Sequence, residues 1–106
     1  MAIVDKEKTM KAATRYLELR GLEDVYEVDG WLTAFDPETK EQVIVKVDVC
    51  LDGFDHELPA REEFEEAAPK LLALIDKFDV GLRFDWCQLL IVGTDRAMVR
   101  HAVDVY

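Results

Sequence analysis

Lys46 and Asp48 are the first residues whose types and spacing suggest chemistry. They stand two positions apart in a largely apolar segment, residues 43–50. Successive side chains of a β-strand point to opposite faces of its sheet, so this acid and this base would share one face. They form either a functional pair or an ordinary ion pair, because structural ion pairs have the same composition as many active sites.

The segment that carries the pair is predicted to be a strand, because β-branched residues alternate with other residues along it. One face of this strand would carry Val43, Val45, Val47 and Val49. The opposite face would carry Ile44, Lys46, Asp48 and Cys50. The acid and the base therefore lie on the face that the four valines do not occupy.

The elements that must position this strand follow from apolar spacing and turn signals. In chain order they are a helix over 5–20, strands over 24–28, 31–35 and 43–51, a helix from Pro59 to about Phe78, and strands over 82–92 and 97–105. Asp29-Gly30 is a strong hairpin signal between the first two strands. Pro69 lies inside the second helical pattern, so we expect a kink or a break just before it.

The order α-β-β-β-α-β-β predicts an α/β fold with two main helices and a mixed sheet of about five strands. The helix between the third and fourth strands suits a crossover connection, which places it against the sheet. A chain of 106 residues is expected to form one domain, spanning 1–106.

The composition restricts the cellular compartment in which the protein is expected and the partners that it can bind. No apolar run approaches the length of a membrane span, and the first nine residues are too polar for a signal peptide. Cys50 and Cys87 lie in apolar runs, as buried free thiols do in a reducing compartment. We therefore predict a cytoplasmic protein that does not bind membranes.

The formal net charge of −10 is unevenly distributed along the chain. Residues 1–20 carry +2, residues 21–51 and 52–79 carry −6 each, and residues 80–106 balance. Nucleic-acid binding depends on Lys and Arg that neutralise phosphates, so this balance makes a nucleic-acid partner unlikely.

Three short motifs carry a resemblance to a known family. The first helix contains Ala13, Tyr16, Leu17 and Gly21 in the pattern A-x-x-Y-L-x-x-x-G; residues 83–89 begin with R-F-D, and residues 98–103 form a closing element. In this order the motifs resemble those of the YraN-type predicted endonucleases, of the restriction-endonuclease-like superfamily. The resemblance implies a restriction-endonuclease-like fold. It also implies a site in which carboxylates hold a divalent metal ion and a lysine helps to position the nucleophile.

The chain departs from that family at the residues that perform the chemistry. The family motif V-E-V-K aligns with residues 45–48, which places Lys46 at the glutamate and Asp48 at the lysine. The hairpin alignment places Trp31 at the metal-binding aspartate and Asp29 at the preceding glutamate. The helix that follows is acidic where the family is basic. We therefore expect a degenerate nuclease site, with no catalytic residues, metal or cofactor.

Binding to a protein partner, or to a second copy, is the function expected of such a domain. An exposed edge strand or an apolar patch around Trp31 could mediate a homodimer. The alternative is a divergent nuclease acting on DNA or RNA, with Asp29, Asp48 and Lys46 as its site, the two aspartates as candidate metal ligands, and Mg²⁺ or Mn²⁺ as cofactor. A third possibility is an acidic decoy that occupies the basic surface of a partner.

Four other residues could have chemical roles, but simpler explanations are expected for them. Cys87 is surrounded by apolar residues, which indicates a buried thiol that behaves as a small hydrophobe. Asp85 and Arg83 are expected to have a structural role. His101 is expected to be an ordinary strand residue.

Overall fold

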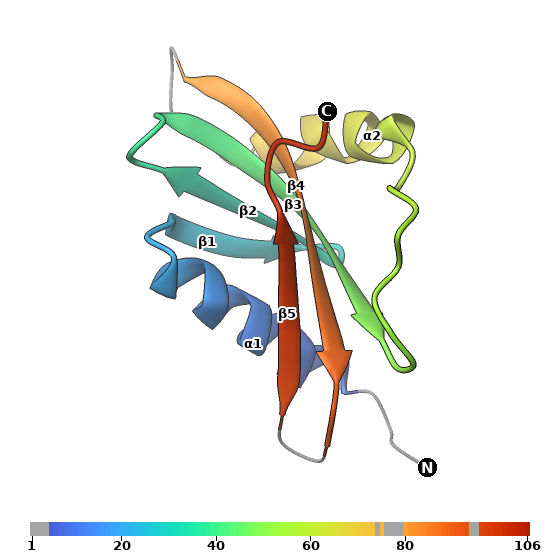
Figure 1. Cartoon of the computed structure of the whole chain (residues 1–106). Coiled ribbons are helices and arrows are strands. Elements are labelled where there is room, and N and C mark those ends of the chain that lie inside the picture. The colour runs from blue at the N-terminus through green and yellow to red at the C-terminus, as the bar shows by residue number, and fades with distance from the viewer. Residues whose placement is uncertain (1–4, 74, 76–79, 94–95) are drawn as a thin grey trace.

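The structure is a computed structural model that describes residues 5–73, 75, 80–93 and 96–106. Its elements follow the predicted order (Figure 1). They are α1 (Lys6–Leu19), β1 (Glu23–Val28), β2 (Trp31–Asp36), β3 (Glu41–Cys50), α2 (Arg61–Leu72), β4 (Gly81–Ile91) and β5 (Ala97–Ala102). The α/β class, the five strands and the two helices are confirmed. No helix within these described ranges is long and apolar enough to cross a membrane.

The five strands form one mixed sheet in the spatial order β1-β2-β3-β4-β5. β3 and β4 run parallel, and every other neighbouring pair is antiparallel. The parallel pair requires a crossover connection, which α2 provides. β1 and β5 are the two edges of the sheet.

The two helices cover opposite faces of this sheet (Figure 1). On the α1 face, Ala13 and Leu17 pack with Val43 and Val45 in a fully buried core. On the α2 face, Ile44 packs with Phe64 and Phe84. The alternation of β3 therefore divides its side chains between two cores, as the sequence predicts.

Local backbone geometry explains where α1 and the first hairpin end. The Asp5 side chain accepts hydrogen bonds from the Glu7 and Lys8 N–H groups and caps α1 at its start. Gly21, with φ +92°, ends the helix in the left-handed region. Asp29 and Gly30 have φ values of 50° and 83°, as a type I′ hairpin turn requires at both central positions.

The later part of the chain differs from expectation in two places. α2 begins at Arg61 rather than Pro59 and ends at Leu72, and it continues through Pro69, so of the predicted kink or break the break is wrong. The Ile75 N–H turns back to the Leu72 carbonyl and closes the helix end, while residues 76–79, over which the predicted helix continued, lie outside the described part. β5 ends at Ala102 because Asp104, with φ +55°, leaves the extended conformation.

Candidate functional site

Lys46 and Asp48 lie together on the α2 face and share a cluster with two residues from other elements. The Lys46 Nζ is 3.5 Å from Asp48 Oδ2 and 3.3 Å from Glu63 Oε1. The Trp86 indole N–H donates to Asp48 Oδ2 at 2.7 Å. We call these four residues, Lys46, Asp48, Glu63 and Trp86, the Lys46 cluster. It places one ammonium between two carboxylates.

Glu63 has a second role, at the start of α2. Its Oε2 accepts a hydrogen bond from the Ala60 N–H at 3.1 Å, which satisfies a donor at the helix N-terminus. Sequence reasoning treated residues 61–66 only as an acidic run and missed this residue. Its position three residues into the helix, where a glutamate can reach back to the cap residue, was the available signal.

Asp29 does not join the Lys46 cluster. It lines a cavity of about 270 Å³ beneath α2, together with Trp31, Glu63, Glu66 and Lys70 among others. Among the described residues, no group of three or more His, Cys, Asp or Glu side chains is placed to hold a metal ion. Of the residues of the alternative nuclease site, Lys46 and Asp48 are therefore paired, whereas Asp29 lines a cavity that shares only Glu63 with the Lys46 cluster.

Trp31 packs into the core beneath α2. Its ring meets Phe64 edge to face, with centroids 5.3 Å apart. It lies directly across from Lys46 in the β2–β3 register, so the two side chains leave the sheet on the same face. The residue that aligns with a metal ligand in the resembled family thus has an aromatic packing role here.

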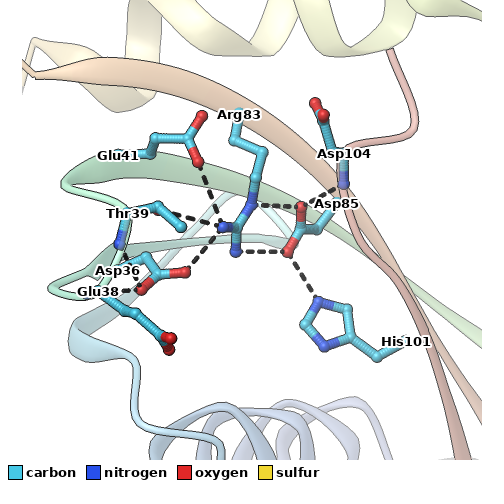
Figure 2. Close-up of polar contacts among 8 residues, drawn as sticks. All are labelled: Asp36, Glu38, Thr39, Glu41, Arg83, Asp85, His101 and Asp104. Atoms are coloured by element: carbon cyan, nitrogen blue, oxygen red, sulfur yellow. Dashed lines mark hydrogen bonds and ion pairs between the residues drawn. The ribbon is translucent and has the colours of Figure 1, made fainter.

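A second charged cluster lies on the α1 face, where Arg83 holds Asp85 (Figure 2). The Arg83 guanidinium donates to both oxygens of Asp85, at 2.9 and 3.1 Å, and to Asp36 Oδ2 at 2.7 Å. His101 Nε2 lies 2.8 Å from Asp85 Oδ2, and the Asp104 N–H donates to Oδ1. We call Arg83, Asp85, Asp36 and His101 the Arg83 cluster.

The Arg83 cluster is largely buried, and its contacts favour the ionised forms of Asp85, Asp36 and Arg83. Asp85 has no exposed surface and Arg83 is 6% exposed. Burial by itself raises the pKa of Asp85, but hydrogen bonds from His101, Arg83 and the Asp104 N–H outweigh it and hold that pKa below the usual range. Burial also acts against Asp36, whose pKa is nevertheless lowered by Arg83 and by the Thr39 and Glu38 N–H groups. The pKa of Arg83 is raised, because its hydrogen bonds to Asp85 and Asp36 outweigh its burial.

Arg83 pairs with Asp85, in keeping with the structural role expected of both residues, whereas the expectation for His101 is corrected. His101 is not an ordinary strand residue, because its imidazole contacts a fully buried carboxylate. It sits diagonally across β4–β5 from Asp85, a position within reach of a long side chain. Every oxygen of Asp85 is engaged, so this cluster ties three strands together and offers no free carboxylate for chemistry.

Cys87 is buried, as expected. Burial first, and the Asp85 charge second, raise the pKa of its thiol to about 12. A thiol with that pKa carries almost no thiolate at neutral pH, so it is a poor nucleophile. Cys50 is also buried, and its thiol donates to Gln88 Oε1.

The two sheet edges differ sharply. β1 carries Glu23, Asp24 and Glu27, and its register shifts between Glu23 and Tyr26. Charged side chains and such irregularities are the devices by which proteins block unwanted pairing at an edge.

β5 has fewer charged side chains than β1 and no such irregularity in its register. It pairs with β4 in an unbroken register over all six of its residues, Ala97–Ala102. When histidine is counted as neutral, Arg100 is the one charged residue of this strand. Met98 is 55% exposed, and Val103, just beyond the strand, is 54% exposed. No described strand pairs with the outer side of β5. This edge is therefore the part of the described structure best suited to accept another strand.

No family model, no curated protein and no solved structure matches this chain, so comparison establishes neither its family nor its activity.

Proposed function

We propose that this chain is a non-catalytic, restriction-endonuclease-like domain that binds protein by adding a strand to its β5 edge. The observation that carries the proposal is the contrast between the two edges: β1 is acidic and irregular, whereas β5 is regular and nearly uncharged. The element order and the mixed sheet with helices on both faces support the architectural part.

Strand addition suits this edge for a physical reason. An edge strand presents a row of unpaired N–H and C=O groups, and an extended segment of a partner can bond to all of them. The main-chain bonds supply affinity, while the side chains on either face select the partner. Residues 80–106 carry no net charge, so a strand can approach this edge without the repulsion that the acidic segments would impose on an acidic partner.

The proposal is tested with an extended peptide and an edge variant. A fluorescent peptide of residues 96–103 should bind the full chain, measured as a rise in fluorescence anisotropy. Val99→Pro should abolish this binding, because proline removes an N–H and blocks the edge. A scrambled peptide of the same composition is the control for general stickiness. Equal binding of the peptide to the Val99→Pro chain, with its fold intact by circular dichroism, would remove β5 as the binding strand.

One observation favours the second candidate, a divergent nuclease. Asp48, Glu63 and Lys46 meet on one face, so two carboxylates and a base are close together. The base lies between the two carboxylates, however, and Asp48 also accepts the Trp86 N–H. A metal ion would have to displace the ammonium to reach both carboxylates.

We therefore expect no metal-dependent cleavage. The purified chain is incubated with single- and double-stranded DNA and RNA, with Mn²⁺ or with chelator, beside Asp48→Ala. We expect the substrates to remain intact in every sample. Cleavage that needs both Mn²⁺ and Asp48 would establish the nuclease instead.

A further inference from the structure

The hydrogen-bond pattern of β4–β5 determines which backbone groups of β5 face outward. In an antiparallel ladder, residue pairs alternate between those that exchange hydrogen bonds and those that do not. The Val92 N–H donates to the Arg96 carbonyl, so this pair is of the bonded kind. In the β4–β5 register, the bonded pairs that follow are Leu90 with Met98 and Gln88 with Arg100.

The even-numbered residues of β5 are therefore bonded to β4, and the odd-numbered residues point their N–H and C=O groups away from it. The outward groups belong to Ala97, Val99 and His101. Beyond β5 the register shifts by one residue: Asp104 has φ +55°, and the Val105 N–H donates to the Phe84 carbonyl, so the stated alternation holds for β5 itself, Ala97–Ala102.

We propose that the partner of the β5 edge is a second copy of this chain, paired antiparallel through β5 about a two-fold axis at Val99. This inference rests on the proposed function and names its partner. In this register Val99 bonds to Val99 of the other copy, and Ala97 bonds to His101. These are three bonded pairs, each exchanging two hydrogen bonds, and they use every outward backbone group of β5.

Charge selects this register over the neighbouring one. A shift of the axis to Arg100 would place the two Arg100 side chains directly opposite each other, and like charges at such positions are destabilising. With the axis at Val99, Arg100 instead lies opposite Met98, whose side chain is largely exposed in the single copy. The aliphatic stem of an arginine can cover such an apolar side chain while its head stays in water.

The positions of the helices and the distribution of charge are also compatible with a second copy at the β5 edge. α1 packs mainly on β1, β3 and β4, and α2 packs on β3, so both helices are centred away from the β5 edge. α1 reaches β5 through the Tyr16 ring, which meets the His101 ring edge to face, while no described strand occupies the outer hydrogen-bonding side of β5. Two chains of net charge −10 repel each other at most contacts, and the balanced segment 80–106 is where that repulsion is smallest.

Cross-linking of variants that each carry one added cysteine tests the partner and the register together. Met98→Cys and Arg100→Cys are prepared in the full chain, mixed in equal amounts and gently oxidised. The two side chains would face each other at a non-bonded pair, which has the closer Cα spacing of about 4.5 Å. Identical residues of the two copies would be diagonal neighbours at about 7–8 Å, too far for a disulfide without movement of the backbone.

We expect intact-mass measurement to find cross-linked pairs of mixed composition in large excess over pairs of either variant with itself. Adding Val99→Pro to both variants should abolish the cross-link. The unsubstituted chain is the control, since Cys50 and Cys87 are buried and should not cross-link copies. A predominance of Arg100→Cys self-pairs would overturn the register.

The outcomes separate this inference from the proposed function. A chain that stays monomeric by light scattering and forms no cross-link, yet binds the peptide of residues 96–103, accepts a strand but not a second copy. That result would overturn the dimer alone. A chain that neither binds the peptide nor cross-links would overturn both. A dimer that persists in Val99→Pro would place the interface elsewhere and overturn the β5 dimer, while binding of the peptide would still decide the proposed function.

Discussion

Asp85→Ala should lower the free energy of unfolding by about 3–5 kcal/mol, the usual cost of breaking a buried ion pair by removing one partner. Asp85 is fully buried and bonds to Arg83, His101 and the Asp104 N–H. Its removal leaves the buried Arg83 guanidinium without its bidentate acceptor. Urea denaturation followed by circular dichroism measures the loss.

Two variants serve as controls for this prediction. Asp48→Ala removes a carboxylate that is 32% exposed, so we expect a loss of about 1 kcal/mol or less. Arg83→Met with Asp85→Leu replaces both charges by apolar side chains, and it should recover part of the stability lost in Asp85→Ala. An Asp85→Ala variant as stable as Asp48→Ala would show that the Arg83 cluster contributes little to folding.

The same cluster predicts how stability depends on pH. The pKa values of Asp85 and Asp36 are lower in the folded chain than the ordinary value of 3.8. The unfolded chain therefore binds protons first as the pH falls. The stabilisation from these two groups is complete above the unfolded pKa and is lost as the pH falls through their folded pKa values. Below pH 4 the loss of stability should be shallower in Asp85→Ala than in the unsubstituted chain.

The parts of this structure that the sequence predicts are those set by near neighbours in the chain. The alternation of residues 43–50 assigned the two faces of β3 correctly, because a period of two is imposed by the strand itself. Asp29-Gly30 predicted the hairpin, because few residue pairs tolerate two positive φ values in succession. The end of α2 was predicted less well, because apolar spacing continues past Leu72, where the helix stops.

The contacts between distant segments could not be predicted in this way. Glu63 meets Lys46, and His101 meets Asp85, only because the sheet order and the crossover place α2 and β5 where they are. A side chain's type shows that it needs a partner when buried, but it does not identify which partner. Arg83 and Asp85 stand two residues apart on one strand and therefore share one face, so their spacing could have predicted this pair.

Phe64→Ala should be the most disruptive single change on the other face of the sheet. Phe64 is fully buried and contacts three aromatic rings: it stacks on Phe84 with centroids 5.2 Å apart and meets Trp31 and Tyr106 edge to face. Truncation of a buried phenylalanine typically costs about 3–5 kcal/mol. Because domains of this size are stable by only about 5–15 kcal/mol, that loss is a large share of the total.

The change should also weaken the attachment of α2 to the sheet. Glu63, which pairs with Lys46, is the residue before Phe64, so both contacts are made by the first turn of α2. The Tyr106 hydroxyl donates to the Pro59 carbonyl and so attaches Tyr106 to the segment just before α2. We therefore expect Phe64→Ala to lose near-ultraviolet circular dichroism from Trp31 and Trp86, and to unfold at a lower urea concentration.

A matched substitution on α1 separates loss of a core side chain from a general effect of truncation. Leu19 is 77% exposed, so Leu19→Ala should change the free energy of unfolding by no more than about 0.5 kcal/mol. If Phe64→Ala were equally mild, the aromatic cluster could not be what holds α2 on the sheet. The position of Glu63 beside Lys46 would then need another cause. A large loss in Phe64→Ala alone would show that this apolar contact, rather than the half-exposed ion pair, fixes the geometry of the Lys46 cluster.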